Sequence, residues 1–123
     1  MPPKDWTIRL EDMIEAGEKV IRYTREMSSL QAFSSNEMAI DAVIRNVQII
    51  GEAARHIPDE VRARYPDVDW VGIRGMRNIL VHQYGAVRLD VVWNVVQTDI
   101  PVTLPRLREI LERELPEEPS PPV

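Results

Sequence analysis

The chain has 123 residues, of which 44% are apolar and 28% are charged. These values are ordinary for one globular domain with a single core, and they exclude a disordered chain. The chain holds no cysteine, which excludes a disulfide framework, a thiolate metal cluster and a cysteine nucleophile.

Charged residues interrupt every helix-length window, so a membrane span is not expected. Residues 1–6 lack the basic segment and apolar run of a secretory signal. We therefore predict a cytoplasmic protein with one helical domain over residues 1–115 and a Pro- and Glu-rich tail over residues 116–123.

The first half of the chain is predicted to form two long helices. Apolar residues recur at three- and four-residue steps, which is the spacing of amphipathic helices. This pattern covers about residues 5–31 and then about residues 36–56. Ser34 and Glu37 have the spacing of a capping box before the second helix, which we expect to stop before Pro58.

The middle of the chain is predicted to hold a connector and a third helix. Two prolines and a run of charges over residues 58–69 indicate a connector with one short helical turn at 59–64. Asp69 is a suitable N-cap for a helix from Val71 to about Gln83, and Gly85 is placed to end it.

A fourth helical stripe runs from Leu89 to Leu111, and Pro101 and Pro105 are expected to kink or split it. The segment 91–96 is rich in β-forming residues, yet it has no partner strand, so we predict a helix there as well. The expected fold is an all-α, up-and-down bundle of four main helices.

The charge of the chain is unevenly distributed. From Trp70 through Leu89 there is no Asp or Glu, while Arg74, Arg77 and Arg88 fall inside this window. The window therefore carries a charge of +3 and the rest of the chain carries −8, since the total is −5. A basic island on an acidic body predicts a localised anion site.

The basic island holds the densest group of residues suited to chemistry, namely Arg77, Asn78, His82 and Tyr84. On one helix Asn78 and His82 share a face, whereas Arg77 and His82 point about 140° apart. A cleft walled by two copies of this helix would gather the four side chains more easily than one copy.

These residue types suit cleavage of RNA without a metal, because the island offers no carboxylate to hold one. Histidine exchanges protons near neutral pH, so His82 is the candidate that draws a proton from the ribose 2′-hydroxyl. Arg77 is the candidate that stabilises charge developing on phosphorus, and Asn78 assists. We expect no cofactor and no metal.

The motif Arg77-x4-His82-x-Tyr84 resembles the signature of the HepT-like proteins in the HEPN superfamily. The likeness covers about residues 8–112. It also rests on further segments in the order and spacing of that family: Ile50-Gly-Glu-Ala-Ala54, Tyr65-Pro66, Trp70, Gly75-Met-Arg-Asn-Ile-Leu-Val-His82 and Val92-Trp93.

The resemblance implies a helical bundle that forms a homodimer through the region of the motif. It also implies an RNase that is the toxin of a type II-like or type VII toxin–antitoxin pair, with Arg77 and His82 as the catalytic pair. The antitoxin partner would be a minimal nucleotidyltransferase that transfers AMP to Tyr84. Such an AMP group would place negative charge where the RNA phosphate must lie.

Other residues leave alternatives open. Arg45, Glu52 and Arg74 are candidates to line the cleft, although the first two suit solvated ion pairs better. Glu52 and His56 have the spacing of a metal pair, but two ligands are too few. Trp70 suits a core position better than base stacking. The alternative function is a catalytically inactive module that binds a nucleotidyltransferase or a nucleotide.

Overall fold

The protein is a helical bundle organised around one central helix. A computed structural model describes residues 5–80 and 88–115, and for residues 77–80 it describes the backbone alone. No strand occurs within those ranges, so the predicted all-α class is confirmed. In chain order the elements are α1 (Asp5–Thr24), α2 (Leu30–Ser34), α3 (Glu37–Ala54), α4 (Asp59–Arg64), α5 (Trp70–Leu80), α6 (Leu89–Asn94), the π-helix η1 (Val95–Asp99) and α7 (Ile100–Glu114).

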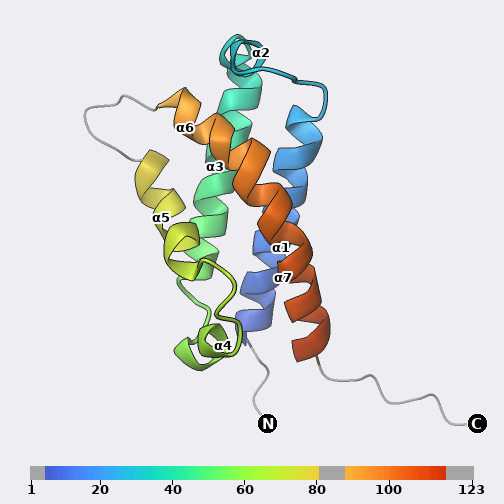
Figure 1. Ribbon diagram of the computed structural model, residues 1–123, viewed down its shortest axis with the longest axis vertical. Coiled ribbons are helices and arrows are strands. Elements are labelled where there is room, and N and C mark those ends of the chain that lie inside the picture. Colours follow the sequence, from blue (N-terminus) through green and yellow to red (C-terminus); the bar gives the residue numbers. More distant parts are fainter. Residues whose placement is uncertain (1–4, 81–87, 116–123) are drawn as a thin grey trace, which may run out of the picture.

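The four main helical rods are α1, α3, α5 and the continuous run of α6, η1 and α7 (Figure 1). Helix α3 packs against α1 and against α5, and α7 packs against α1. In Figure 1 the last rod crosses the bundle diagonally, from α6 beside the top of α5 to α7 beside the lower part of α1. No helix of the described ranges is long and apolar enough to cross a membrane.

The core is a single cluster that draws side chains from every rod. Each fully buried aliphatic or aromatic side chain stabilises the fold by about 1.5–3 kcal/mol relative to exposure. The largest of those that are almost completely buried are Phe33, Leu10, Met13, Ile110, Val20, Val43, Val47, Val61 and Val92. Because these residues are spread from α1 to α7, one hydrophobic core holds the described helices together.

The first helix ends earlier than the sequence pattern predicts. Helix α1 stops at Thr24, whose hydroxyl donates a hydrogen bond to the Val20 carbonyl at 2.8 Å. The expected extension to residue 31 is wrong because Ser29 caps a separate short helix, α2, and accepts a hydrogen bond from the Ala32 N–H.

The second helix has the predicted position but a different cap. Asn36, and not Ser34, accepts the hydrogen bond from the Ala39 N–H at 3.0 Å at the start of α3. Ser34 instead belongs to α2. Helix α3 ends at Ala54, before Pro58 as expected, and the predicted turn at 59–64 is α4.

The last rod is interrupted just before Pro101, as the sequence predicts. Pro101 has no N–H, so the Gln97 carbonyl lacks the usual partner four residues on. The Ile100 N–H bonds to the Val95 carbonyl five residues back, and η1 is therefore a π-helix. Pro105 lies inside α7 without ending it. The expected helix over 91–96 is confirmed by α6 and the start of η1.

The contact between Phe33 and Trp93 holds α6 in place, and a substitution of Phe33 tests it. The Phe33 ring is fully buried and stacks on Trp93 with a centroid distance of 5.3 Å. We expect Phe33→Ala to lower the free energy of unfolding by about 3–5 kcal/mol, because a buried aromatic is replaced by a cavity. Urea denaturation of wild type and Phe33→Ala at one fixed protein concentration measures this change in the free energy of unfolding. The control is Met38→Ala at an 84% exposed position, expected to change stability by less than about 0.5 kcal/mol.

Candidate functional site

The sequence-predicted site begins on α5, and the start of this helix is firmly fixed. Asp69 accepts a hydrogen bond from the Gly72 N–H at 3.0 Å, which confirms its predicted capping role. Trp70 is only 6% exposed, and its Nε1 donates to the Tyr65 carbonyl at 3.0 Å. Trp70 is therefore a core residue, and the alternative of base stacking on it is wrong.

The structure places two of the four motif residues on helical backbone. Arg77 and Asn78 lie in the last turns of α5, whereas His82, Tyr84 and the predicted helix end at Gly85 lie outside the described residues. By helical register, position 78 falls four residues after exposed Arg74. Position 77 falls four residues after buried Ile73, so the two positions lie on neighbouring sides of α5, as the spacing predicts.

The further candidates lie on exposed faces. Arg45 and Glu52 are both exposed and share one face of α3, where Glu52 accepts long hydrogen bonds of 3.4 Å from Arg55. His56 is exposed just after α3. Among the described residues no three His, Cys, Asp or Glu side chains gather to hold a metal ion.

Arg74 is the candidate that shares a helix with the motif. It is exposed on α5, and within the described ranges its guanidinium forms no ion pair or hydrogen bond. A charge without a partner at the surface is available to an anion or to a carboxylate from another molecule.

The connector before α5 is tied to α7 by hydrogen bonds that no sequence pattern predicts. Glu114 accepts hydrogen bonds from Arg64 at 2.8 and 3.0 Å and from the Tyr65 hydroxyl at 2.9 Å. Burial and this hydrogen bond raise the pKa of Tyr65. Arg106 donates to Asp67 at 2.7 and 3.2 Å and lowers the pKa of that carboxyl. The connector that leads into α5 is thereby tied to α7 at two points.

The helix on the far side of residues 81–87 is anchored too. Arg88 and Asp90 form an ion pair at 2.7 Å, which lowers the pKa of Asp90. Trp93 stacks on Phe33 of α2, and this contact joins α6 to the top of the bundle. Both helices that flank the segment with His82 and Tyr84 are therefore fixed to the core.

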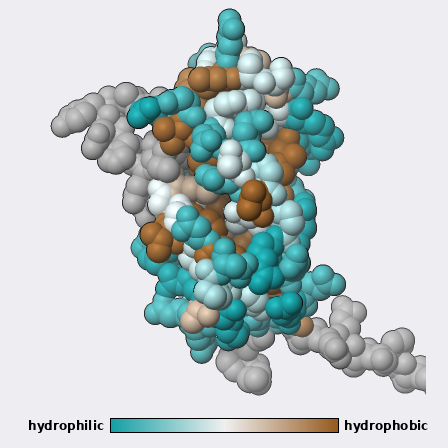
Figure 2. All heavy atoms as spheres, viewed as in Figure 1, coloured by the Kyte–Doolittle hydropathy of each residue, from teal (hydrophilic) through white to brown (hydrophobic). Residues whose placement is uncertain are grey.

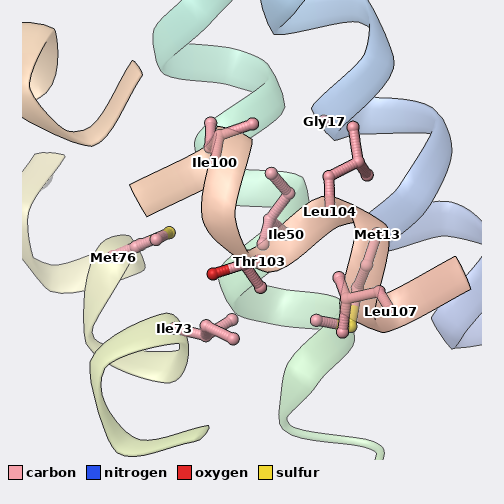
Figure 3. Close-up of a pocket in the computed structure, with 9 residues that line it drawn as sticks. All are labelled: Met13, Gly17, Ile50, Ile73, Met76, Ile100, Thr103, Leu104 and Leu107. Atoms are coloured by element: carbon pink, nitrogen blue, oxygen red, sulfur yellow. The ribbon is translucent and has the colours of Figure 1, made fainter. Parts of the chain in front are cut away.

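A cleft separates α5 from η1 and α7, and we call it the α5–α7 cleft. A small apolar pocket adjoins it, where the Thr103 side chain extends from α7 toward Ile73 and Met76 of α5 (Figure 3). In Figure 2 apolar atoms are visible in the depression between α5 and the last rod, with hydrophilic atoms around it. The residues that line its upper part are Asp67, Val68, Asp69, Gly72, Ile73, Met76, Val95, Thr98, Asp99, Val102, Thr103 and Arg106.

Sequence reasoning missed this cleft, since its walls come from positions about 30 residues apart. One feature of the sequence pointed to this region: Pro101 interrupts the regular helical pattern of the last rod. The cleft is acidic, with Asp67, Asp69 and Asp99 against Arg106, whose guanidinium already pairs with Asp67 and Glu109.

Comparison with known proteins identifies the class. The sequence matches the family described as "Ribonuclease HepT-like" over residues 13–114, which spans all four rods. The chain therefore belongs to the HepT-like ribonuclease family, a family of RNA-cleaving enzymes, and the resemblance seen in the sequence is confirmed.

Individual relatives agree with this membership. The chain is 37% identical over 101 residues to "Putative RNase MJ1380" of Methanocaldococcus jannaschii, covering 82% of this chain and 92% of the relative. It is 38% identical over 92 residues to "Probable ribonuclease HepT" of Thermococcus cleftensis, covering 75% and 83%. No solved structure matches the chain.

The tie between Asp67 and Arg106 predicts a pH dependence of stability. The folded-state pKa of Asp67 lies below its unfolded value of about 3.9, so the ion pair stabilises the fold above that pH. This contribution is lost as the pH falls through the folded pKa. We expect wild type to be more stable than Asp67→Asn at pH 6, with the difference shrinking below about pH 4.

Urea denaturation of both proteins between pH 6 and pH 2.5 measures this difference. Asp41→Asn is the matched control, because Asp41 is exposed on α3 and has no ion pair within the described ranges. A gap between wild type and Asp67→Asn that stayed constant down to pH 2.5 would contradict the role given to the ion pair.

Proposed function

We propose that the protein is a metal-independent endoribonuclease and the toxin of a type II-like or type VII toxin–antitoxin pair. One observation carries the proposal: the family match over residues 13–114 includes the acid-free island with Arg77, Asn78, His82 and Tyr84. Arg74 on the same helix is exposed and has no ion pair within the described residues, and it adds positive charge where an RNA backbone would bind.

The reaction is an attack of the RNA on itself. An imidazole nitrogen of His82 takes the proton of the ribose 2′-hydroxyl, and the 2′-oxygen forms a bond to the adjacent phosphorus. The bond from phosphorus to the 5′-oxygen breaks, and that oxygen receives a proton from a protonated imidazole. The products are a 2′,3′-cyclic phosphate and a 5′-hydroxyl, so no water is consumed and no metal is needed.

The remaining island residues stabilise charge on the phosphate and position the reacting groups. Arg77 stabilises the negative charge that develops on the phosphorus oxygens, which is worth about 10²- to 10³-fold in rate for a comparable hydrogen-bond donor. Asn78 and Tyr84 position the imidazole or the phosphate. Arg74, Arg45 and Glu52 are candidates to line the RNA-binding cleft between two copies, which is distinct from the α5–α7 cleft. The proton for the leaving oxygen comes from His82 of the second copy.

The composite site requires a homodimer, and its regulation requires a second protein. A cognate minimal nucleotidyltransferase acts as antitoxin by transferring AMP to Tyr84. The added phosphate carries negative charge and bulk into the site, so it opposes binding of the RNA backbone. We base this partner on the family alone, because Tyr84 lies outside the described residues.

The alternative function is a catalytically inactive module that binds a nucleotidyltransferase or a nucleotide. The acidic balance of the chain, −5 overall, is the observation that favours it, since net negative charge weakens binding of RNA. Under this alternative the island is a docking and modification surface only.

The chain contains two histidines, so one serves as the control for the other. We expect His82→Ala to lose at least about 100-fold in cleavage of total RNA, because it removes the general base. His56→Ala is expected to cleave like wild type. The assay uses purified protein with Tyr84 shown by mass to be free of AMP, in EDTA, and the fragment ends are analysed for 2′,3′-cyclic phosphate.

Three outcomes would count against the proposal. Cleavage by His82→Ala at the wild-type rate would exclude the mechanism. Activity that EDTA removes, together with an inactive His56→Ala, would favour the metal pair Glu52 and His56. No cleavage by the unmodified wild type, with binding of a nucleotidyltransferase retained, would favour the inactive module.

A further inference from the structure

The α5–α7 cleft is an elongated groove that the proposed reaction does not use. Its walls are α5 on one side and η1 with α7 on the other. The second wall runs from Val95 to Arg106, and a helix of this length spans about 16 Å. The space beside Val102 is about 360 Å³, which lies within the range of about 300–1,000 Å³ typical of binding pockets.

Apolar side chains line the middle of the groove. Ile73 and Met76 of α5 lie across from Val95 of η1, and Thr103 extends between the two walls (Figure 3). On the rim, Val102 is 74% exposed. A compact ligand inside the groove would leave Val102 in water, whereas a polypeptide segment that lies along the groove covers it.

The groove carries negative charge that the described residues leave without a counter-charge. The Asp99 carboxylate is half-buried and has no hydrogen bond or ion pair in the described part of the chain. Asp69, on the opposite wall, accepts one backbone hydrogen bond at the start of α5. The guanidinium of Arg106 already binds Asp67 and Glu109. A carboxylate that is partly removed from water is stabilised by a cation beside it.

These groups disfavour two kinds of occupant. The carboxylates repel the phosphates of RNA. A metal ion is not supported, because no three His, Cys, Asp or Glu side chains gather among the described residues. The chemistry that matches both the apolar walls and the carboxylates is a cationic group on an aliphatic stem, as in arginine and lysine.

We propose that the α5–α7 cleft is a docking groove for a segment of a different protein. An arginine or lysine of that segment enters between Asp69 and Asp99, and its aliphatic neighbours cover Met76 and Val102. Charge complementarity and the length of the groove carry this assignment. No residue that lines the groove has a role in the proposed RNA cleavage, so the inference goes beyond that function and does not rest on it.

The first experiment uses the side-chain group by itself. Isotope-labelled protein is titrated in an NMR experiment with butylguanidinium, which has the charge and stem of arginine, and with butylurea, its neutral counterpart. We expect saturable shifts of the Gly72, Asp99 and Thr103 amides with butylguanidinium. Butylurea is expected to bind at least about ten-fold more weakly, because it forms no ion pair.

Matched variants locate the charge that binds the probe. Asp99→Asn is expected to weaken binding of butylguanidinium at least about ten-fold, because it removes the carboxylate that has no counter-charge. Asp41→Asn removes the same charge from an exposed position on α3 and is expected to change binding by less than about two-fold.

A peptide tests whether the occupant is a protein segment. The probe is a fluorescent peptide with one central arginine flanked on both sides by leucine and alanine, and anisotropy measures its binding. Because the leucines add apolar contact, we expect it to bind at least about ten-fold more tightly than butylguanidinium. Val102→Lys is expected to weaken peptide binding about ten-fold. Val71→Lys, at an 80% exposed position outside the groove, is expected to leave it within about two-fold.

Three outcomes would overturn the inference. Amide shifts that are scattered over the surface, or that persist in Asp99→Asn, would exclude a cation site in the groove. A peptide that binds no more tightly than butylguanidinium would identify a small organic cation as the occupant. Groove resonances that shift with protein concentration alone would identify a second copy of the chain. Each of these outcomes leaves the proposed ribonuclease standing, because no residue that lines the groove has a role in that reaction.

Discussion

The packing of one side of α5 against α3 is the contact on which the rest of the arrangement depends. Ile73 and Met76 bury that side beside Ile50, while Asp69 and Trp70 fix the start of the helix. The helix is held along one side and at one end. Its other side is exposed at Val71 and Arg74, and its last turns hold the backbone of Arg77 and Asn78. The proposed ribonuclease site therefore begins on a helix whose first turns are fixed to the core.

Most of the fold could be predicted from the sequence because its helices are amphipathic. The three- and four-residue spacing predicted the helices now seen as α1, α3, α5 and α7, and Pro58 and Pro101 predicted where helices end or distort. The early end of α1 was not predictable from periodicity. Apolar Met27 and Leu30 continue the pattern past Thr24, while the capping preference of Ser29 decides the local structure.

For the candidate site, the sequence predicted the type of reaction and the residue types, but not the contacts that position them. Residue types and the acid-free window predicted Arg77 and His82, and this choice stays a prediction, because the side chain of Arg77 and all of His82 lie outside the part of the chain that the structure describes. The contacts that position α5 could not be predicted, because Glu114 meets Tyr65 and Arg106 meets Asp67 across 49 and 39 residues of chain. No local pattern encodes which charges meet after folding.

The π-helix η1 corrects the angular phase of the last rod. Val92, Val96, Ile100 and Leu104 are buried at successive four-residue steps, and on a regular α-helix each such step turns the apolar stripe by about 40°. The wider turn of η1 takes up this drift, so the stripe keeps facing α1 and α3 while Asp99 and Thr103 face the cleft. If the same five residues were wound as a regular α-helix, all of α7 would be turned against the core, since an α-helix turns more per residue than a π-helix. The π-turn therefore sets which residues of α7 face the core and which face the cleft.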